Sequence, residues 1–271
     1  MNFLKELFSY PFVTRVLIAG VLISLSASLL GVNLVLKRFS MLGDGLSHVS
    51  FGTAAIALAL GVAPLKISIP IVIIAAFLLL RLNKNSRMKG DAAIAVVSSG
   101  ALAIGIAVAT VTEGFNTDMS NYMFGSILSI SKSDVYISVA VSLVVILLCI
   151  LFYNKLFVVS FDEDFALACG ARVGVYNSLS AVLTAVVVVV GMRLMGALLI
   201  SSIITVPVLS AMRVCKRYKS VTVLAVIISV IAFISGLLIS FFYDIPAGAS
   251  VVIVNLIIFL FLTVLSKIKT R

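Results

Sequence analysis

Residues 220–243 read SVTVLAVIISVIAFISGLLISFFY, an apolar run that contains no charged side chain. About 20 consecutive apolar residues are enough for a helix to cross the roughly 30 Å hydrocarbon core of a membrane. The run is therefore long enough to span a membrane as a single helix. Similar runs recur along the rest of the chain.

The composition places the whole chain in the same class. Hydrophobic residues make up 62% of the sequence, charged residues make up 11%, and the mean hydropathy is +1.30. Soluble domains carry about 45–50% apolar and about 25% charged residues, so a soluble globular domain is excluded. The sequence predicts an all-α, polytopic membrane helical bundle.

Charged residues, glycines and prolines divide the chain into nine predicted transmembrane helices. They are Val13–Leu36, Asp44–Leu60, Leu65–Leu82, Ala92–Thr112, Val135–Tyr153, Val175–Met192, Leu194–Met212, Ser220–Tyr243 and Ala247–Ser266. We expect residues 13–271 to form a single transmembrane domain. Residues 1–12 do not resemble a removed signal peptide and are predicted to form an interfacial amphipathic helix. Its apolar side would carry Phe3, Leu4, Leu7 and Phe8.

Basic residues predict the orientation of these spans. Fifteen of the 20 Lys and Arg residues fall on one side: Lys37, Arg38, Arg81, Lys84, Arg87, Lys89, Lys155, Arg172, Arg213, Lys216, Arg217, Lys219, Lys267, Lys269 and Arg271. Because basic loops stay in the cytoplasm, nine spans put the N-terminus outside and the C-terminus inside. The net charge of +10 therefore indicates membrane orientation rather than nucleic-acid binding.

Asp44 and His48 are the most informative polar residues. His48 is the only histidine of the chain, and it follows a carboxylate by four residues at the start of an apolar helix. Positions i and i+4 share one helix face, so the two side chains could hold one cation. Ionisable residues at membrane depth usually face a bundle interior or a water-filled path. The alternative is that Asp44 caps the helix and His48 is a hydrogen-bonded core residue.

Two other classes of site find no support in the sequence. The three cysteines, Cys149, Cys169 and Cys215, are scattered, so neither a disulfide framework nor a thiolate zinc site is expected. The chain has no G-x-x-x-x-G-K-[ST] phosphate loop, so it cannot supply an ATP site itself.

The segment 161–173 is a predicted cytoplasmic element. It carries three consecutive acids, Asp162, Glu163 and Asp164, followed by Phe165 and a short helix-forming run that ends at Gly170. Acidic residues stabilise the positive N-terminal end of a helix. We expect a small helix on the membrane surface that contacts a soluble partner, with a solvated linker as the alternative.

Several ordered stretches resemble the zinc/manganese/iron permease family of ABC importers. Residues Gly31–Gly52 contain a Gly-Asp-x-x-Ser-His element like the one that opens the helix after the first span in that family. Tyr122–Leu128 resembles its outer short helix, Phe161–Val173 its coupling helix, and Met195–Pro207 its late-span motif.

The resemblance implies a type II ABC importer permease that is not itself an enzyme. Such a subunit sits in a bacterial cell membrane as a homodimer, with cytoplasmic ATPase subunits and an extracellular or periplasmic metal-binding protein. It implies that Asp44 and His48 bind the transported ion, and that Asp162, Glu163, Asp164, Phe165 and Gly170 belong to the ATPase-coupling helix. Two chains would together supply four ligands, enough for tetrahedral Zn²⁺.

The choice of metal depends on the ligands and on the residues after His48. An imidazole with a carboxylate suits Zn²⁺ and also accommodates Mn²⁺ or Fe²⁺. Zinc-type members of the family tend to continue as Val49-Ser-Phe-Gly52 does here, whereas manganese-type members often place proline soon after the histidine. No proline follows His48 until Pro64. The resemblance therefore favours zinc.

Pro207 lies inside a predicted span, where it removes one backbone hydrogen-bond donor. Ser201, Ser202 and Thr205 lie close by in the sequence and could satisfy the freed carbonyl. These four residues are candidates for lining the transport path, and a static packing kink is the alternative.

Two further function classes receive little support from the sequence. A secondary, proton-coupled metal transporter could also bury an Asp–His pair, but no internal repeat supports this class. An intramembrane metalloprotease needs two histidines in an H-E-x-x-H element, and the single histidine nearly excludes it.

Overall fold

The computed structural model describes residues 11–85, 90–112, 122–125 and 131–269. Within these ranges the chain is helical, with no strand. The helices are α2 (Pro11–Leu36), α3 (Leu42–Ala59), α4 (Pro64–Asn85), α5 (Gly90–Val111), α7 (Lys132–Leu151), α8 (Tyr153–Phe161), α9 (Glu163–Ala168), α10 (Val173–Met195), α11 (Ala197–Val214), α12 (Tyr218–Tyr243) and α13 (Ala247–Lys269). The all-α membrane bundle is therefore confirmed. The interfacial helix predicted for residues 1–12 lies outside the described residues, apart from Pro11 and Phe12, which begin α2.

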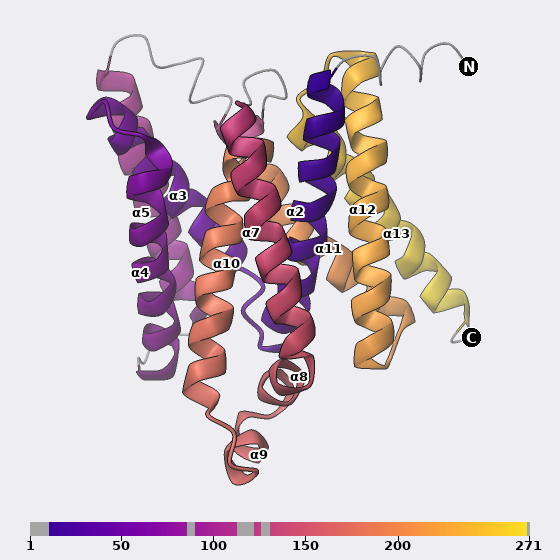
Figure 1. Cartoon of the computed structure of the whole chain (residues 1–271). Helices are drawn as coiled ribbons and strands as arrows, with labels where there is room; N and C mark the ends of the chain where they lie inside the picture. Colours follow the sequence, from indigo (N-terminus) through magenta and orange to yellow (C-terminus); the bar gives the residue numbers. More distant parts are fainter. Residues whose placement is uncertain (1–10, 86–89, 113–121, 126–130, 270–271) are drawn as a thin grey trace.

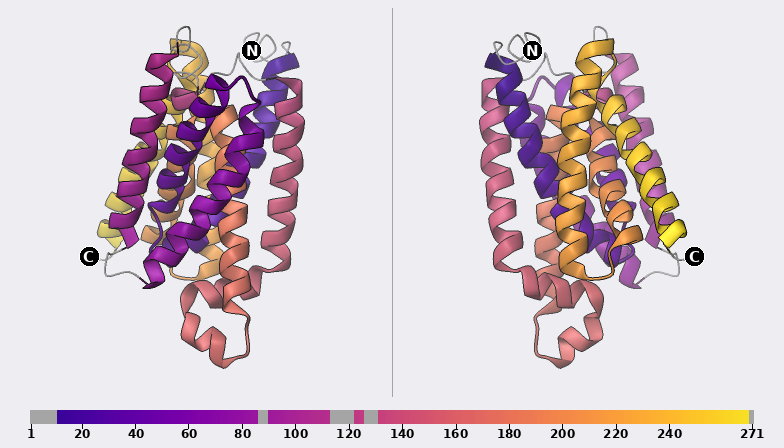
Figure 2. Two further views of the ribbon diagram at one scale, coloured as in Figure 1. Left: turned by 90° about the vertical axis from the view of Figure 1, so that its left-hand side faces the viewer. Right: turned by 90° about the vertical axis from the view of Figure 1, so that its right-hand side faces the viewer.

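Long helices run between two ends of the bundle (Figure 1). The first described residues lie at the upper end, and the chain finishes at the lower end with α13. Helices α8 and α9 lie at the lower end, where α9 projects beyond the others, as two further views also show (Figure 2). Residues Lys37, Arg81, Lys155 and Arg217, which the sequence places on the basic side, lie at the ends of helices that meet this lower end.

Eight described helices are long and apolar enough to cross a membrane: α2, α4, α5, α7, α10, α11, α12 and α13. The one remaining predicted span, Asp44–Leu60, corresponds to α3, which has 18 residues and does not reach the apolarity of the others. It packs against α4, α5, α10 and α11, and most of its side chains are buried. Because neighbouring helices cover most of its surface, α3 can keep buried Gly, Ser and Thr residues, whereas Asp44 and His48 stay partly exposed.

The core is centred where α2, α10 and α11 meet. Its largest fully buried side chains include Ile23 and Leu30 of α2, Met192 of α10, and Ile200 and Ile204 of α11. Gly31 lets α2 approach α11 closely, because a Cβ there would lie 1.9 Å from the Ile204 carbonyl oxygen. Small residues of this kind are the usual means by which membrane helices pack backbone to backbone.

The break between α10 and α11 differs from the predicted one. The sequence predicts a boundary at Arg193, whereas the helix continues to Met195 and breaks at Gly196, which has φ of 86°. Arg193 does not interrupt the helix because its Nε lies 3.0 Å from Asp134 Oδ1 of α7. A neutralised cation is compatible with a span, and the glycine alone supplies the conformation that ends it.

The predicted outer short helix is described only at residues 122–125. Residues 122–124 are helical, and Gly125 follows with φ of 80°. A Cβ on Gly125 would lie 2.3 Å from the Met195 carbonyl oxygen, so this turn rests directly on the α10–α11 break. The remaining part of the predicted helix lies outside the described residues.

Candidate metal site

Asp44 and His48 lie on the first turns of α3, one helical turn apart. His48 Nε2 is 3.7 Å from Asp44 Oδ1, and the two side chains expose 24% and 49% of their surface, respectively. The distance is longer than a hydrogen bond, so the two groups are adjacent without being bonded to one another. An ion placed between them would therefore not have to break a strong contact.

The alternative role of Asp44 as a helix cap does not agree with the local geometry. Helix α3 begins at Leu42, and its N-cap residue, Met41, makes no side-chain capping bond. Asp44 is the third residue of the helix, where its negative charge is stabilised by the positive end of the helix dipole. Its carboxylate therefore remains available at the surface of the helix.

His48 also departs from the pattern of a satisfied core histidine. Its Nδ1 is buried and has no hydrogen-bond partner within the described part of the chain. Buried polar atoms of native proteins are nearly always paired, so this ring nitrogen is not satisfied in the way that a core histidine usually is. The other ring nitrogen, Nε2, is the one that lies beside Asp44 and could bind an ion on the open strip.

Glycines on either side of Asp44 shape this part of α3. A Cβ on Gly43 would lie 3.1 Å from Ile204 Cδ1 of α11, and a Cβ on Gly45 would lie 2.6 Å from Ile94 Cγ2 of α5. Since a helix turns about 100° per residue, Asp44 and His48 lie on the strip between these two contacts. The glycines bring α11 and α5 close and leave this strip uncovered.

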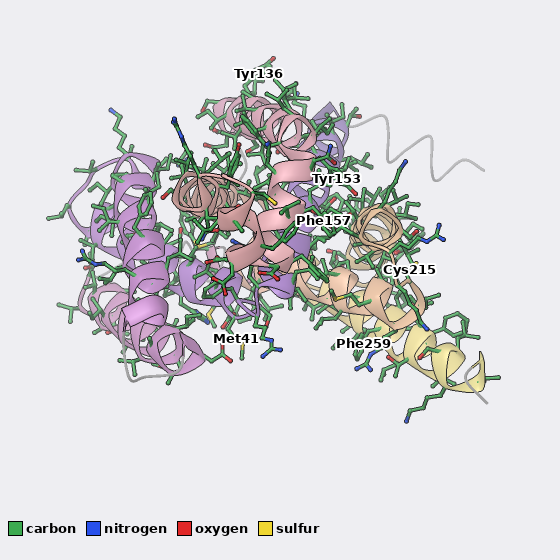
Figure 3. The ribbon with its side chains drawn as sticks, turned by 90° about the horizontal axis from the view of Figure 1, so that it is seen from below. Met41, Tyr136, Tyr153, Phe157, Cys215 and Phe259 are labelled. Atoms are coloured by element: carbon green, nitrogen blue, oxygen red, sulfur yellow. The ribbon has the colours of Figure 1, made fainter. Side chains whose placement is uncertain are left out.

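The uncovered strip faces the outside of the bundle. Met41, which precedes α3, exposes 55% of its surface. Seen from below, it lies on the side of the bundle away from Tyr136, between the group of α3, α4 and α5 and the group of α11, α12 and α13 (Figure 3). Met41 therefore marks an exposed side of the bundle at the start of α3.

One chain cannot complete a metal site with the residues that the structure describes. Among them, no group of three or more His, Cys, Asp or Glu side chains is arranged to hold a metal. Transition-metal sites usually need four or more ligands, so two further protein ligands or water molecules would be required. A second copy of the strip would supply the missing pair.

The predicted path residues of α11 occupy different environments. Pro207 is buried inside α11 without ending it, and Ser202 is buried with no partner for its hydroxyl in the described part of the chain. Ser201 donates to the Leu198 carbonyl, and Thr205 lies 3.2 Å from the Ser201 carbonyl. These hydroxyls therefore bond to carbonyls other than that of Ile203, the group that Pro207 leaves free. Their role in lining a path stays a prediction.

The structure separates the predicted coupling residues into inward and outward groups. Asp162 is the N-cap of α9, and its Oδ1 accepts a 2.9 Å hydrogen bond from the Phe165 backbone N–H. Asp164 and Phe165 are exposed, whereas Glu163 turns toward the bundle and contacts Lys37. Gly170, with φ of 75°, follows α9.

Sequence reasoning missed the inward partners of this segment. Lys37 was assigned only to the basic side of the membrane, and Asn177 was not singled out. Neither residue belongs to a recognisable motif. The contacts of Lys37 with Glu163 and Asn177 join positions that are more than 100 residues apart in the chain. A single sequence carries no periodic signal for such a contact.

Comparison with known proteins supports the family-level reading of these features. A model described as "ABC 3 transport family" matches residues 9–266. The solved structure of PsaBC from Streptococcus pneumoniae in complex with Fab superposes with a TM-score of 0.85 and 30% identity, covering 96% of this chain and 94% of the other.

Two relatives are named for the import of different metals. The manganese import system permease protein ScaB of Streptococcus gordonii is 30% identical, covering 96% of this chain and 93% of its own length. The high-affinity zinc uptake system membrane protein ZnuB of Haemophilus influenzae is 29% identical, covering 90% and 93%. Manganese names are more frequent than zinc names among relatives at this level of identity.

Proposed function

The chain belongs to the ABC 3 transport family, the membrane permeases of metal ABC importers, and we propose that its cargo is Zn²⁺ bound by Asp44 and His48. The observation that carries this proposal is the position of His48, the only histidine, whose Nε2 lies 3.7 Å from Oδ1 of the half-exposed Asp44 carboxylate. Both groups lie on a strip of α3 that the rest of the chain leaves open.

The proposed ion site is shared between two copies of the chain. Each copy contributes one imidazole and one carboxylate, so a homodimer with facing strips offers four ligands. An Asp and His pair without thiolates forms a site of moderate strength, which suits a carrier that must release its cargo. Ser201, Ser202, Thr205 and Pro207 of α11 are proposed to line the path next to this site.

Manganese is the second candidate cargo, and Fe²⁺ would use the same ligands. The names of most relatives favour manganese, whereas the residues after His48 and the affinity order of divalent metals favour zinc. Competition between the two metals separates these candidates.

The proposed assembly supplies the energy and the selectivity that this chain lacks. Cytoplasmic ATPase subunits dock at the lower end of the bundle against α9, and a metal-binding protein delivers the ion at the upper end. The chain is then a multi-pass protein of the bacterial cell membrane with its C-terminus in the cytoplasm, since the helix ends that carry Lys37, Arg81 and Arg217 meet the same end of the bundle as α9.

Uptake of radioactive zinc into proteoliposomes that hold the full importer tests this proposal. Asp44→Asn and His48→Ala should each lower ATP-dependent uptake by at least about tenfold, since each removes one ligand from both copies. Ser50→Ala is the matched control, because Ser50 is buried on another face of α3 and its hydroxyl has no partner in the described region. An excess of manganese should compete poorly if zinc is the cargo.

Several outcomes would contradict the proposal. Wild-type uptake by both variants would remove Asp44 and His48 from the site. Stronger competition by manganese than by zinc would reassign the cargo while keeping the site. Uptake driven by a proton gradient without the ATPase would replace the importer with a secondary transporter.

A further inference from the structure

Helix α9 has one face against the bundle and one face toward solvent. Ala166 is fully buried against Val159 of α8 and Val173 of α10, and Glu163 lies three residues earlier on the same face. Phe165 and Leu167 each expose 59% of their surface on the other side. A partner that binds the outer face would therefore push on a helix whose inner face is already anchored.

Glu163 forms the polar part of that anchor. Its Oε1 lies 3.4 Å from Lys37 Nζ and accepts a 2.8 Å hydrogen bond from Asn177 Nδ2. The Lys37 ammonium also donates to Asn177 Oδ1. The Lys37 side chain is only 10% exposed and that of Glu163 is 34% exposed, so water screens this contact less than an open surface pair. The three residues tie α9, α10 and the end of α2 together.

Lys37 lies in the turn that leads directly into α3, the helix that carries Asp44 and His48 and is called the metal helix below. Arg38 follows it with φ of 60°, and the Phe39 N–H donates to the Leu34 carbonyl, so residues 37–41 form a tight turn between α2 and α3. Thr205 of α11 also reaches this turn, with Oγ1 3.3 Å from the Ser40 carbonyl oxygen. Lys37 therefore lies seven residues before Asp44, with one tight turn between them.

A second polar contact ties the neighbouring helix to the same part of α2. The buried Asn33 accepts hydrogen bonds through Oδ1 from Tyr218 of α12, at 3.0 Å, and from Ser160 of α8, at 3.3 Å. Ser160 lies three residues before Glu163. Helices α8 and α9 thus contact the end of α2 and the turn that follows it at two points, Asn33 and Lys37.

A cavity of about 750 Å³ lies beside this turn. Its lining includes Lys37, Phe39, Phe77, Arg81, Glu163 and Asn177, from the turn, α4, α9 and α10. The cavity is open to the surface of the chain, so the turn has room to shift relative to α4. On the α9 side, the turn is held by the polar contacts of Lys37 with Glu163 and Asn177. On the α4 side, the turn borders the open cavity.

We propose that Lys37, Glu163 and Asn177 form the joint that passes movement of α9 to the helix bearing Asp44 and His48. This inference rests on the proposed function. It assigns Glu163 to positioning the metal helix rather than to contacting the ATPase, and it leaves Asp164, Phe165 and Leu167 for that contact. Paired charges on two separate elements move together, because separating them would leave each charge without its partner.

Charge exchange in the complete importer tests the joint. In proteoliposomes with the ATPase and the metal-binding protein, Lys37→Glu and Glu163→Lys should each lower zinc taken up per ATP hydrolysed by about tenfold. Basal hydrolysis and copurification of the ATPase should stay within about twofold of wild type, because the outer face of α9 is unchanged. The exchanged pair Lys37→Glu with Glu163→Lys should recover at least half of the wild-type ratio.

Two further variants keep the test decisive. Glu163→Gln retains the acceptor for Asn177 and removes only the charge, so it should fold and still lower the ratio severalfold. Asp164→Lys, on the exposed side, should weaken copurification of the ATPase and should not be rescued by Lys37→Glu.

The outcomes separate this inference from the proposed function. A wild-type ratio in Glu163→Gln, or no recovery in the exchanged pair, overturns the joint while leaving zinc uptake by the wild-type importer intact. Failure of the wild-type importer to accumulate zinc or manganese would instead overturn the proposed function.

Discussion

Arg193 of α10 and Asp134 of α7 form an ion pair, with Nε 3.0 Å from Oδ1, at the upper end of the bundle. Asp134 is buried, and its second carboxylate oxygen accepts a 2.7 Å hydrogen bond from Ser131 Oγ. The pair explains why a charged residue lies within one turn of the end of a transmembrane helix. It also fixes the relative position of two helices that flank the centre of the bundle.

Breaking this pair should destabilise the protein. Arg193→Met leaves the Asp134 carboxylate buried without its partner, and the free energy of unfolding should fall by about 3 kcal/mol. Denaturant unfolding in detergent micelles measures the change. The double variant Asp134→Asn with Arg193→Met should recover most of the loss, because it also removes the stranded charge.

Arg213 provides the matched control for that experiment. Its guanidinium lies 5.6 Å from the centre of the Phe259 ring and faces no buried acid in the contacts described for it. Arg213→Met should therefore cost at most about 1 kcal/mol. An equal loss in both arginine variants would show that the ion pair has no special role.

Gly196 should tolerate no side chain. Its φ of 86° with ψ of 157° is a backbone conformation open essentially to glycine alone, and a Cβ would lie 2.4 Å from the Gly125 nitrogen. Gly196→Ala should lower the free energy of unfolding by about 3 kcal/mol or more, because the backbone of residues 124–125 must move away. Thermal unfolding in detergent would reveal this as a lower melting temperature.

Gly174→Ala is the control for the same helix. Nothing lies within 4 Å of a Cβ at Gly174, near the start of α10. The substitution should therefore leave the melting temperature unchanged or raise it slightly. A loss at Gly174 as large as that at Gly196 would argue against a local clash.

Gly52 should control how closely α3 approaches α5. A Cβ at Gly52 would lie 2.5 Å from the Ala101 carbonyl oxygen, and a Cβ at Gly105 would lie 2.9 Å from the Gly52 Cα. Gly52→Ala should push the two helices apart, lower the melting temperature and reduce zinc uptake severalfold, since α3 carries Asp44 and His48.

Gly100→Ala, on α5, separates this effect from a general effect of alanine. Nothing lies within 4 Å of a Cβ at Gly100, and alanine in a helix is more stable than glycine by about 0.5–1 kcal/mol. Uptake should remain at the wild-type level in this variant. Equal behaviour of the two variants would mean that the α3–α5 crossing does not position the site.

The sequence predicts the helices well because each span is a local property. Apolar length alone places Ser220–Tyr243, which the structure shows as α12 from Tyr218 to Tyr243. The same rule misplaces the α10–α11 boundary, because a single sequence does not reveal that Asp134 neutralises Arg193. Local patterns predict where a helix is possible, and tertiary partners decide where it stops.

The candidate site is also predicted only where its features are local in the sequence. The spacing of Asp44 and His48 predicts their shared face, since four residues make about one helical turn. The contact between Lys37 and Glu163 joins residues 126 positions apart, and only the folded chain brings them together. The sequence predicts one coupling element that holds Asp162, Glu163 and Asp164, and it does not predict that Glu163 contacts Lys37 while Asp164 is exposed.

The burial of α3 has a consequence for biogenesis. Helices α5, α10 and α11, which pack against it, are synthesised after it. Its Gly, Ser, Asp and His residues make α3 less apolar than the other long helices, so the nascent α3 gains less than they do by entering lipid alone. The insertion machinery must therefore retain α3, or admit it together with α2 and α4, until the later helices emerge from the ribosome. Commitment of the metal helix to the bilayer is a late step in the making of this permease.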